Sequence, residues 1–342
     1  MRRIIGRQIK NAVFQSGVQG WLRRAFPSRH PVIIRYHSVS EGNDLVSDGI
    51  TVSPRVFEEQ VSYFAKHFRP IPMDTLMDCV ENGLPFPNNA IVLTFDDGYA
   101  DNYRAAQILQ KYGLTGVFYI TAGCIESEER FWVGEIHYLL GTTNKRSVYV
   151  KVRDKVFESV LDDSNRTEPI RRLTQLIKTV DVATRESIRK TVREQLDDVP
   201  ALENNLMLTW QQLSEMVAMG MEIGGHTVTH CNLPSATKEE AWSEVLQCKI
   251  LLEKRLDTKV RHFAYPNGGS SQYYNSRIKE FVQRAGYRSA VTSKFGAVNL
   301  HNDPFELRRI RTTGRLSEIV WEIEESRIRS VTAAHCADSL QS

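Results

Sequence analysis

Two short groups of side chains in this chain have the types and spacing to hold a metal ion for hydrolysis. Asp96 and Asp97 follow directly on the apolar run Ile91–Phe95, so a buried strand is expected to deliver both carboxylates at its C-terminal end. His226 and His230 stand four residues apart, a spacing that places both rings on one side of an extended segment or a helical turn. Adjacent carboxylates repel each other in a poorly solvated site, and a cation relieves that repulsion. One carboxylate with two imidazoles leaves coordination positions open, which is typical of a catalytic metal.

Each group also has an ordinary structural interpretation. An Asp-Asp-Gly run after a strand is a common turn, because both residue types favour turn geometry. A single histidine such as His226 is commonly a hydrogen-bonded structural residue. Both groups occur here, each after a strand-like run, and this combination favours the metal site.

These residues carry a family resemblance. Thr94–Gly98 and His226–His230 resemble the first and second motifs of the polysaccharide deacetylases that share the NodB homology domain, similar to carbohydrate esterase family 4. The resemblance covers about residues 30–320, with one long insertion. It implies an α/β fold, a distorted (β/α) barrel of the TIM-like kind with a helical insertion.

The resemblance also implies roles for the site residues. Asp97, His226 and His230 would bind a divalent metal, and Asp96 would be the general base. Zinc fits this ligand set, and cobalt, nickel or iron would also fit. The reaction implied is removal of N-acetyl (N-acyl) groups from amino sugars of a polysaccharide or glycoconjugate. Two alternatives stay open: a non-catalytic carbohydrate-binding relic of the fold, and an amidase acting on a non-sugar amide.

A third segment, Phe263–Gly268, resembles the third family motif in a form common among exopolysaccharide deacetylases. Better-studied members have arginine where this chain has Ala264, and tyrosine where it has Asn267. In the family this loop offers a backbone N–H to the oxyanion, and its arginine orients the base. The arginines that could replace it are Arg261, Arg308 and Arg309. The candidate substrate and oxyanion residues are Tyr265, Pro266, Asn267 and Arg309.

The general acid of the family is also absent from its usual place. Its motif is Leu-x-His, and the matching segment here is Leu307–Arg309, whose arginine cannot deliver a proton at working pH. The predicted strand Pro31–His37 ends in a histidine, and the C-terminal ends of barrel strands face the active site. His37 is therefore the predicted replacement, with a purely structural role as the alternative.

Strand and helix signals alternate along the chain, which indicates βα units around a parallel sheet. The predicted organisation is a basic segment at 1–29, the deacetylase barrel at 30–320 with an insertion at about 125–207, and a C-terminal tail at 321–342. Strands are predicted at 31–37, 91–95, 116–121, 260–265, 289–292 and 307–311. Helices are predicted at 54–67, 74–81, 102–112, 167–179, 184–196, 210–219 and 238–256.

Composition narrows the partners and the compartment. A net charge of +3 over 342 residues argues against a nucleic-acid-binding protein. Five scattered cysteines without a Cys-x-x-Cys pair make no disulfide framework and favour a reducing compartment. Neither a signal peptide nor a transmembrane run is recognisable, so a cytoplasmic protein is predicted.

The N-terminal segment is unusually basic. Residues 1–40 contain eight basic side chains and no acid. An apolar stripe beside these charges predicts peripheral contact of residues 1–24 with an anionic membrane. The alternative, which the sequence favours, is an ordinary basic helix packed on the barrel or a frayed terminus. The stripe consists of Ile5, Ile9, Ala12, Val13, Trp21 and Leu22.

Overall fold

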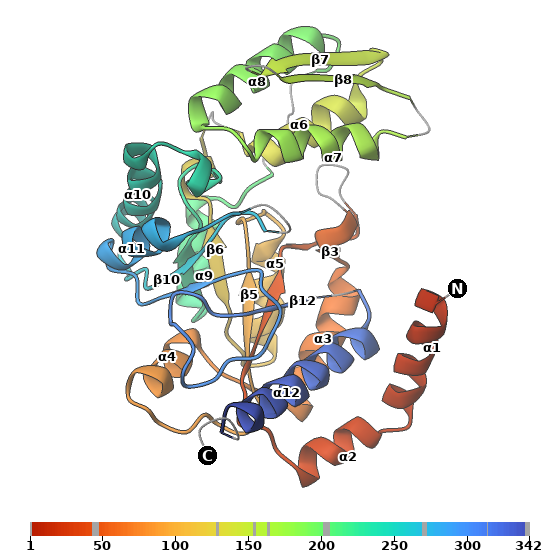
Figure 1. Ribbon diagram of the computed structural model, residues 1–342, viewed down its shortest axis with the longest axis vertical. Helices are drawn as coiled ribbons and strands as arrows, with labels where there is room; N and C mark the ends of the chain where they lie inside the picture. Colours follow the sequence, from red (N-terminus) through yellow and green to blue (C-terminus); the bar gives the residue numbers. More distant parts are fainter. Residues whose placement is uncertain are drawn as a thin grey trace.

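A curled sheet of eight parallel strands surrounded by helices confirms the predicted distorted barrel (Figure 1). The computed structural model describes residues 2–42, 48–127, 130–152, 155–162, 165–200, 206–268, 272–312 and 314–338. The strand order is β11-β10-β9-β6-β5-β1-β12, with β4 paired to β5. These strands are β1 (Val32–Tyr36), β4 (Arg69–Pro70), β5 (Ala90–Phe95), β6 (Val117–Ile120), β9 (Glu222–Gly225), β10 (His262–Ala264), β11 (Ser289–Val291) and β12 (Ile310–Arg311).

Helices connect these strands and cover the outer face of the sheet. Ser53 caps α3 by accepting from the Val56 N–H, and a proline follows it at the first helical position. Thr237 with Glu240 forms a capping box at the start of α10. The helices of the barrel are α3 (Pro54–His67), α4 (Met73–Glu81), α5 (Asn102–Lys111), α9 (Trp210–Ala218), α10 (Lys238–Leu256) and α11 (Ser276–Arg284), and a minor two-stranded sheet pairs β2 (Ser38–Val39) with β3 (Thr51–Val52).

Side-chain alternation along β5 explains how the sheet separates two cores. Ile91, Leu93 and Phe95 pack into the large core beneath the outer helices. Val92 belongs to a second core inside the barrel. Thr94 lies on the same face of the strand as Val92 and contacts Arg309 inside the barrel. Because the strand is buried on both faces, its sequence is an almost unbroken apolar run.

The barrel closes incompletely between its two edge strands. Among the described residues, β11 meets the segment before β12 through one isolated parallel bridge, Val291 to Leu307, in place of a continuous ladder. This segment leads into β12, which pairs in parallel with β1. Arg309 therefore lies where the two ends of the sheet meet, and its side chain reaches Thr94 and Asp96 on the inner side of the barrel.

The predicted insertion forms a separate layer over one end of the barrel (Figure 1). Its helices α7 (Thr167–Ile177) and α8 (Val182–Gln195) confirm the two predicted there, within a few residues. Two elements of the insertion were not predicted from the sequence. They are α6 (Trp132–Thr142) and the antiparallel hairpin of β7 (Ser147–Val152) and β8 (Lys155–Val160). These elements share a hydrophobic core distinct from those of the barrel.

The chain ends are helical and lie at the opposite end of the molecule from the insertion (Figure 1). They comprise α1 (Arg2–Gln15), α2 (Val18–Ala25) and α12 (Leu316–Asp338), and α1 packs along α12. The predicted tail at 321–342 does not begin at an element boundary, because α12 runs across residue 320. Among the described residues, no helix combines the length and apolarity needed to span a bilayer.

Candidate active site

Asp96 and Asp97 lie at the C-terminal end of β5, as predicted, and their side chains diverge. Asp97 adopts a left-handed backbone with φ of 79°, and Gly98 follows at 87°. Aspartate tolerates this conformation better than most residues, and glycine adopts it freely. The turn sends the Asp97 carboxylate toward the two histidines and leaves Asp96 facing Arg309.

The loop after β9 carries His226 and His230. The Nε2 atoms of both rings lie 3.3 Å from the same oxygen of Asp97, Oδ1. All three side chains are at most 7% exposed. Burial and the two imidazole contacts act in opposite directions on the pKa of Asp97, and the imidazoles prevail and lower it well below its usual value. The structure thus brings together the three predicted ligands.

Their geometry fits a tetrahedral cation. An ion with bonds of about 2.0–2.1 Å to nitrogen and oxygen separates its ligand atoms by about 3.3 Å. The ligand atoms of these residues all lie within 4.8 Å of one another. The Nδ1 atom of His226 lies 2.8 Å from the carbonyl oxygen of Ala264, so it carries the proton and Nε2 is free to coordinate.

The histidine loop is held in a costly conformation. Thr227 and His230 have φ of 64° and 55°, values that are rare for residues other than glycine. Glu244 of α10, which is buried, accepts from the N–H groups of Val228 and Thr229 at 2.8 and 2.9 Å. Gly123 donates to the Val228 carbonyl, and a Cβ there would lie 2.7 Å from that oxygen. Close backbone approach therefore fixes the loop that carries both imidazoles.

The insertion supports the same loop from its other side. Arg185 of α8 donates to the carbonyl and hydroxyl oxygens of Thr229 at 3.0 and 2.9 Å. Trp132 of α6 donates from its indole nitrogen to the His230 carbonyl at 3.1 Å. Phe131 packs edge-on against the His230 ring with centroids 5.2 Å apart. Phe131 and Trp132 are 3% and 2% exposed, so they pack against the ligand loop and offer no open stacking surface.

Arg309 forms a bidentate ion pair with Asp96. Its two terminal nitrogens lie 2.7 Å from the two carboxylate oxygens, and its Nε donates to the Thr292 carbonyl. Both side chains are nearly inaccessible, at 1% and 4% exposure. Burial alone would raise the pKa of Asp96, but the Arg309 charge and hydrogen bonds hold that pKa at about 2. Asp96 is therefore ionised and fixed in orientation.

In this chain Arg309 takes the place of the arginine of the third family motif. Arg309 was predicted among the substrate and oxyanion residues. Its terminal nitrogens instead bind Asp96 and orient the carboxylate that was predicted to be the base. Arg261 binds Asp74 beside the start of β10, far from the site. Arg308 is exposed. Among the three candidate replacements, the structure places Arg309 in contact with Asp96.

His37 lies at the end of β1 beside the carboxylates. Its Nε2 is 3.9 Å from Oδ2 of Asp96, and its side chain is 15% exposed. Burial lowers the pKa of His37 to about 4 against the opposing charges of Asp97 and Asp96, so the imidazole is neutral near pH 7. The structure places His37 within the site, as the position of its strand predicted.

The loop after β10 is only partly available to a substrate. Tyr265 and Pro266 are buried, and the Tyr265 hydroxyl donates to the Phe305 carbonyl at 3.0 Å. The Tyr265 N–H donates to the Val291 carbonyl at 3.3 Å. Asn267 differs, because both polar atoms of its side chain are buried without a hydrogen-bond partner in the part of the chain that the structure describes. Its φ of 72° turns the backbone at this point.

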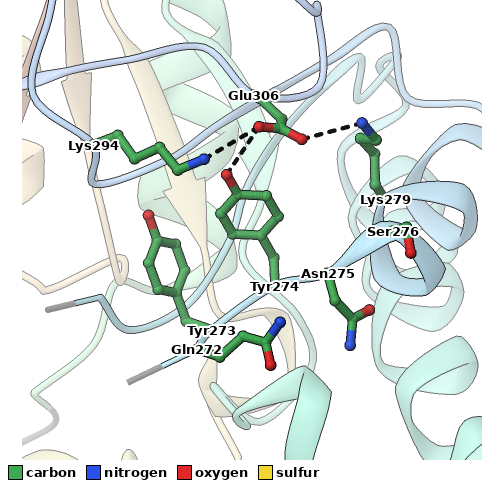
Figure 2. A pocket seen from close by; sticks show the side chains of 8 residues that line it. All are labelled: Gln272, Tyr273, Tyr274, Asn275, Ser276, Lys279, Lys294 and Glu306. Carbon is green, nitrogen blue, oxygen red and sulfur yellow. Dashed lines mark hydrogen bonds and ion pairs between the residues drawn. The ribbon is translucent and has the colours of Figure 1, made fainter. Parts of the chain in front are cut away.

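A pocket of about 370 Å³ lies beside this loop, lined by residues that follow β10 and β11 (Figure 2). In Figure 2 the Glu306 carboxylate accepts hydrogen bonds from Lys279, Lys294 and the Tyr274 hydroxyl. The charges of the side chains that line the pocket therefore largely neutralise one another. The Tyr274 ring stacks on Tyr265. The lining includes none of the predicted site residues.

A second cluster of Asp74, Glu222 and His262 resembles a metal site by composition only. Both oxygens of Glu222 accept backbone N–H groups at the start of α4. Asp74 accepts from His262, Arg261 and Arg288. Since hydrogen bonds and arginine charges already occupy the carboxylates, this cluster reads as a structural network at the N-terminal ends of β9 and β10.

Comparison with known proteins agrees with the class that this fold and site define. Residues 84–290 match the family model of polysaccharide deacetylases, which is more than half of the chain. The chain therefore belongs to the polysaccharide deacetylase family, and it is an amide hydrolase of the deacetylase type. The matched range includes Asp96, Asp97, His226 and His230. It begins after His37 and ends before Arg309.

Individual relatives are distant but cover most of the chain. The Bacillus subtilis protein named "Putative polysaccharide deacetylase YxkH" is 21% identical over 306 residues, 89% of this chain and 78% of that protein. The deacetylase PplD of Streptococcus pyogenes, solved with acetate, superposes with a TM-score of 0.58 at 19% identity, over 88% of this chain and 99% of that one. IcaB of Ammonifex degensii gives 0.57 at 18% identity, over 86% and 97%. The two structures establish the fold.

Proposed function

We propose that this chain is a metal-dependent hydrolase that removes N-acetyl groups from amino sugars of a polysaccharide or glycoconjugate, of the exopolysaccharide type. The observation that carries the proposal is the convergence of His226 and His230 on one oxygen of Asp97, beside an Asp96 that Arg309 holds ionised. Structural turns and isolated histidines do not require this arrangement. Family membership supports the acyl chemistry. The ionised and oriented Asp96, which sugar binding alone would not need, argues against the alternative of a non-catalytic relic.

Asp97, His226 and His230 are the proposed metal ligands, and zinc is the metal that the donor set fits best. A cation held there would supply Lewis acidity toward the amide carbonyl and toward water. The His226 tautomer fixed by Ala264 and the buried position of all three side chains prepare the site for binding.

Asp96 is the proposed general base. Its carboxylate accepts the proton of the attacking water, and a pKa of about 2 keeps it in the accepting form throughout the working pH range. Arg309 binds both oxygens and so limits the orientations of the carboxylate. We assign Arg309 to positioning the base.

The loop after β10 is proposed to meet the developing oxyanion through Asn267. The Tyr265 N–H already donates to Val291, whereas the Asn267 side-chain amide is buried and without a partner in the described part of the chain. Buried polar groups without partners are expensive, and a ligand oxygen would satisfy this one. Tyr265 and Pro266 are buried and are proposed to shape this loop beside the substrate.

His37 is the proposed general acid. A pKa of about 4 leaves its imidazole neutral at rest, so it must take up a proton before it can donate one. Asp96 lies 3.9 Å away and carries the proton removed from water in this proposal. Passing that proton through His37 to the departing amine would complete the hydrolysis and return both groups to their starting forms.

We expect His37→Ala to lower turnover on an amide by about 100-fold or more, the usual scale of general-acid catalysis. An activated ester should be affected little, because its leaving group needs no proton. Metal content should stay unchanged. His30→Ala, two residues before the start of β1 and so at the opposite end from His37, is the matched control. Equal losses on amide and ester would assign His37 a structural role, and no loss on either would remove it from the site.

Acetate release tests the function as a whole. The metal-loaded protein is expected to release acetate from N-acetylglucosamine oligomers and to lose this activity on chelation. Protein loaded with zinc would be offered the oligomer and an N-acetylated peptide at equal concentration, and acetate would be measured for both. Release from the peptide alone would support the amidase alternative. Binding of the oligomer without release from either would support the non-catalytic alternative.

A further inference from the structure

Helix α2 is oriented with its apolar face toward solvent. The residues that it buries are polar, Gln19 and Arg23. Trp21 and Phe26 are 63% and 72% exposed. A surface helix of a globular protein normally buries its apolar stripe and exposes its polar one. The outward face consists of Val18, Trp21, Leu22 and Ala25, which are exposed and spaced to share one side of the helix, together with the exposed Phe26 at its C-cap.

Specific contacts fix this orientation. Arg23 pairs with Glu324 of α12 at 2.7 Å and lies 3.9 Å from the centre of the Phe68 ring. Its carbonyl accepts from the Asn89 side chain. Because the polar side of α2 is anchored to the body of the protein, the apolar side cannot turn inward without breaking an ion pair whose arginine is buried.

The charges around this face are basic. Arg24 and Arg29 are exposed beside it, and residues 1–40 contain no acid. The nearby carboxylates come from α12, where Glu318 pairs with Arg7 and Glu324 with Arg23. The exposed face therefore combines large apolar side chains, one of them a tryptophan, with two arginines that form no ion pair with any residue the structure describes. This is the composition of helices that lie in a lipid headgroup layer.

We propose that α2 docks this chain on the surface of a bilayer that contains anionic lipids, with Trp21 and Phe26 entering the interface. Five side chains of a two-turn helix fall short of the roughly 20–30 residues per side of a stable protein interface, which argues against a second copy as the occupant. A contact of this size is peripheral and reversible. The inference does not depend on the proposed function.

Flotation with vesicles tests the proposal. The intact protein is expected to float with phosphatidylcholine vesicles that contain roughly one phosphatidylglycerol in four, and less with phosphatidylcholine alone. Salt at about 1 M should weaken the binding, because it shortens the screening length to about 3 Å. The double variant Trp21→Glu, Phe26→Glu should lower the partition coefficient by about tenfold or more. Val160→Glu, at a residue 71% exposed on the insertion, is the matched control and should float like the intact protein.

Two further measurements keep the outcomes distinct. Circular dichroism and thermal melting should show the double variant folded like the intact protein, because the replaced side chains are exposed. Sedimentation without lipid should show a species whose mass is unchanged by the substitutions. Failure of the intact protein to float at low salt, or equal flotation of the double variant, would overturn the proposal. A dimer that the double variant dissociates, without vesicle binding, would assign the face to a second copy.

Discussion

Replacing His226 or His230 by alanine is expected to strip the metal from the purified protein and abolish acetate release. Both imidazoles face the same oxygen of Asp97, so loss of either leaves the buried carboxylate with a single imidazole. Removal of an outer-shell partner typically costs about 10–100-fold in metal affinity or activity, and loss of a ligand should exceed that. Metal content per folded molecule would be measured by elemental analysis, with activity measured separately.

His262→Ala is the matched control for these variants. His262 is buried and also lies in a group of two carboxylates and one imidazole, but hydrogen bonds already occupy that group. Its removal should leave the metal content per folded molecule unchanged, whatever it does to stability. Full occupancy in His226→Ala would show that the proposed ligand set is wrong.

Asp96→Asn is expected to keep the metal but reduce turnover by about 100-fold or more, the scale of general-base catalysis. It should also lower stability, because it leaves the buried Arg309 cation without its anion. Asparagine preserves the shape of the side chain and removes its capacity to accept a proton. Arg309→Ala should also reduce turnover, and should destabilise the fold by about 3–5 kcal/mol, because it leaves a buried carboxylate without its cation.

A double-mutant cycle tests whether Arg309 positions the Asp96 carboxylate for catalysis or only stabilises the fold. If Arg309 acts through Asp96, adding Arg309→Ala to Asp96→Asn should cost little further turnover. The stability lost in Arg309→Ala should be partly recovered in the double variant, since no buried charge remains unpaired. Arg308→Ala, at the exposed neighbouring position, is the control and should have no effect on either quantity. Additive losses in turnover would contradict the proposed role of Arg309.

Sequence reasoning succeeded where the signal was local. The apolar run before Asp96 and the spacing of His226 and His230 identify strand ends and a shared face, and both follow from periodicity. Which of the three candidate arginines orients the base could not be predicted from neighbouring residues in the sequence. Arg309 reaches Asp96 because the segment that carries it joins β11 to β1, the neighbour of β5, and no spacing along the sequence reports that closure.

The supports of the histidine loop were missed for a similar reason. Glu244 lies mid-helix in α10, and Arg185 belongs to a stretch that contains neither cysteine nor histidine. The available hint in the sequence was a glutamate that stands among the apolar residues on one side of the helix, such as Ala241, Val245 and Cys248. The orientation of α2 was equally hidden, because an amphipathic pattern gives the two faces of a helix but not which of them meets the protein.

The contacts between the insertion and the ligand loop limit how this enzyme can be redesigned. A variant that replaces residues 126–207 with a short linker would leave the carbonyls of Thr229 and His230 without the donors that Arg185 and Trp132 supply. The left-handed His230 would lose part of what holds it there. The insertion thus serves as a side wall of the ligand loop, and a minimal catalytic barrel would need two replacement donors designed into its linker.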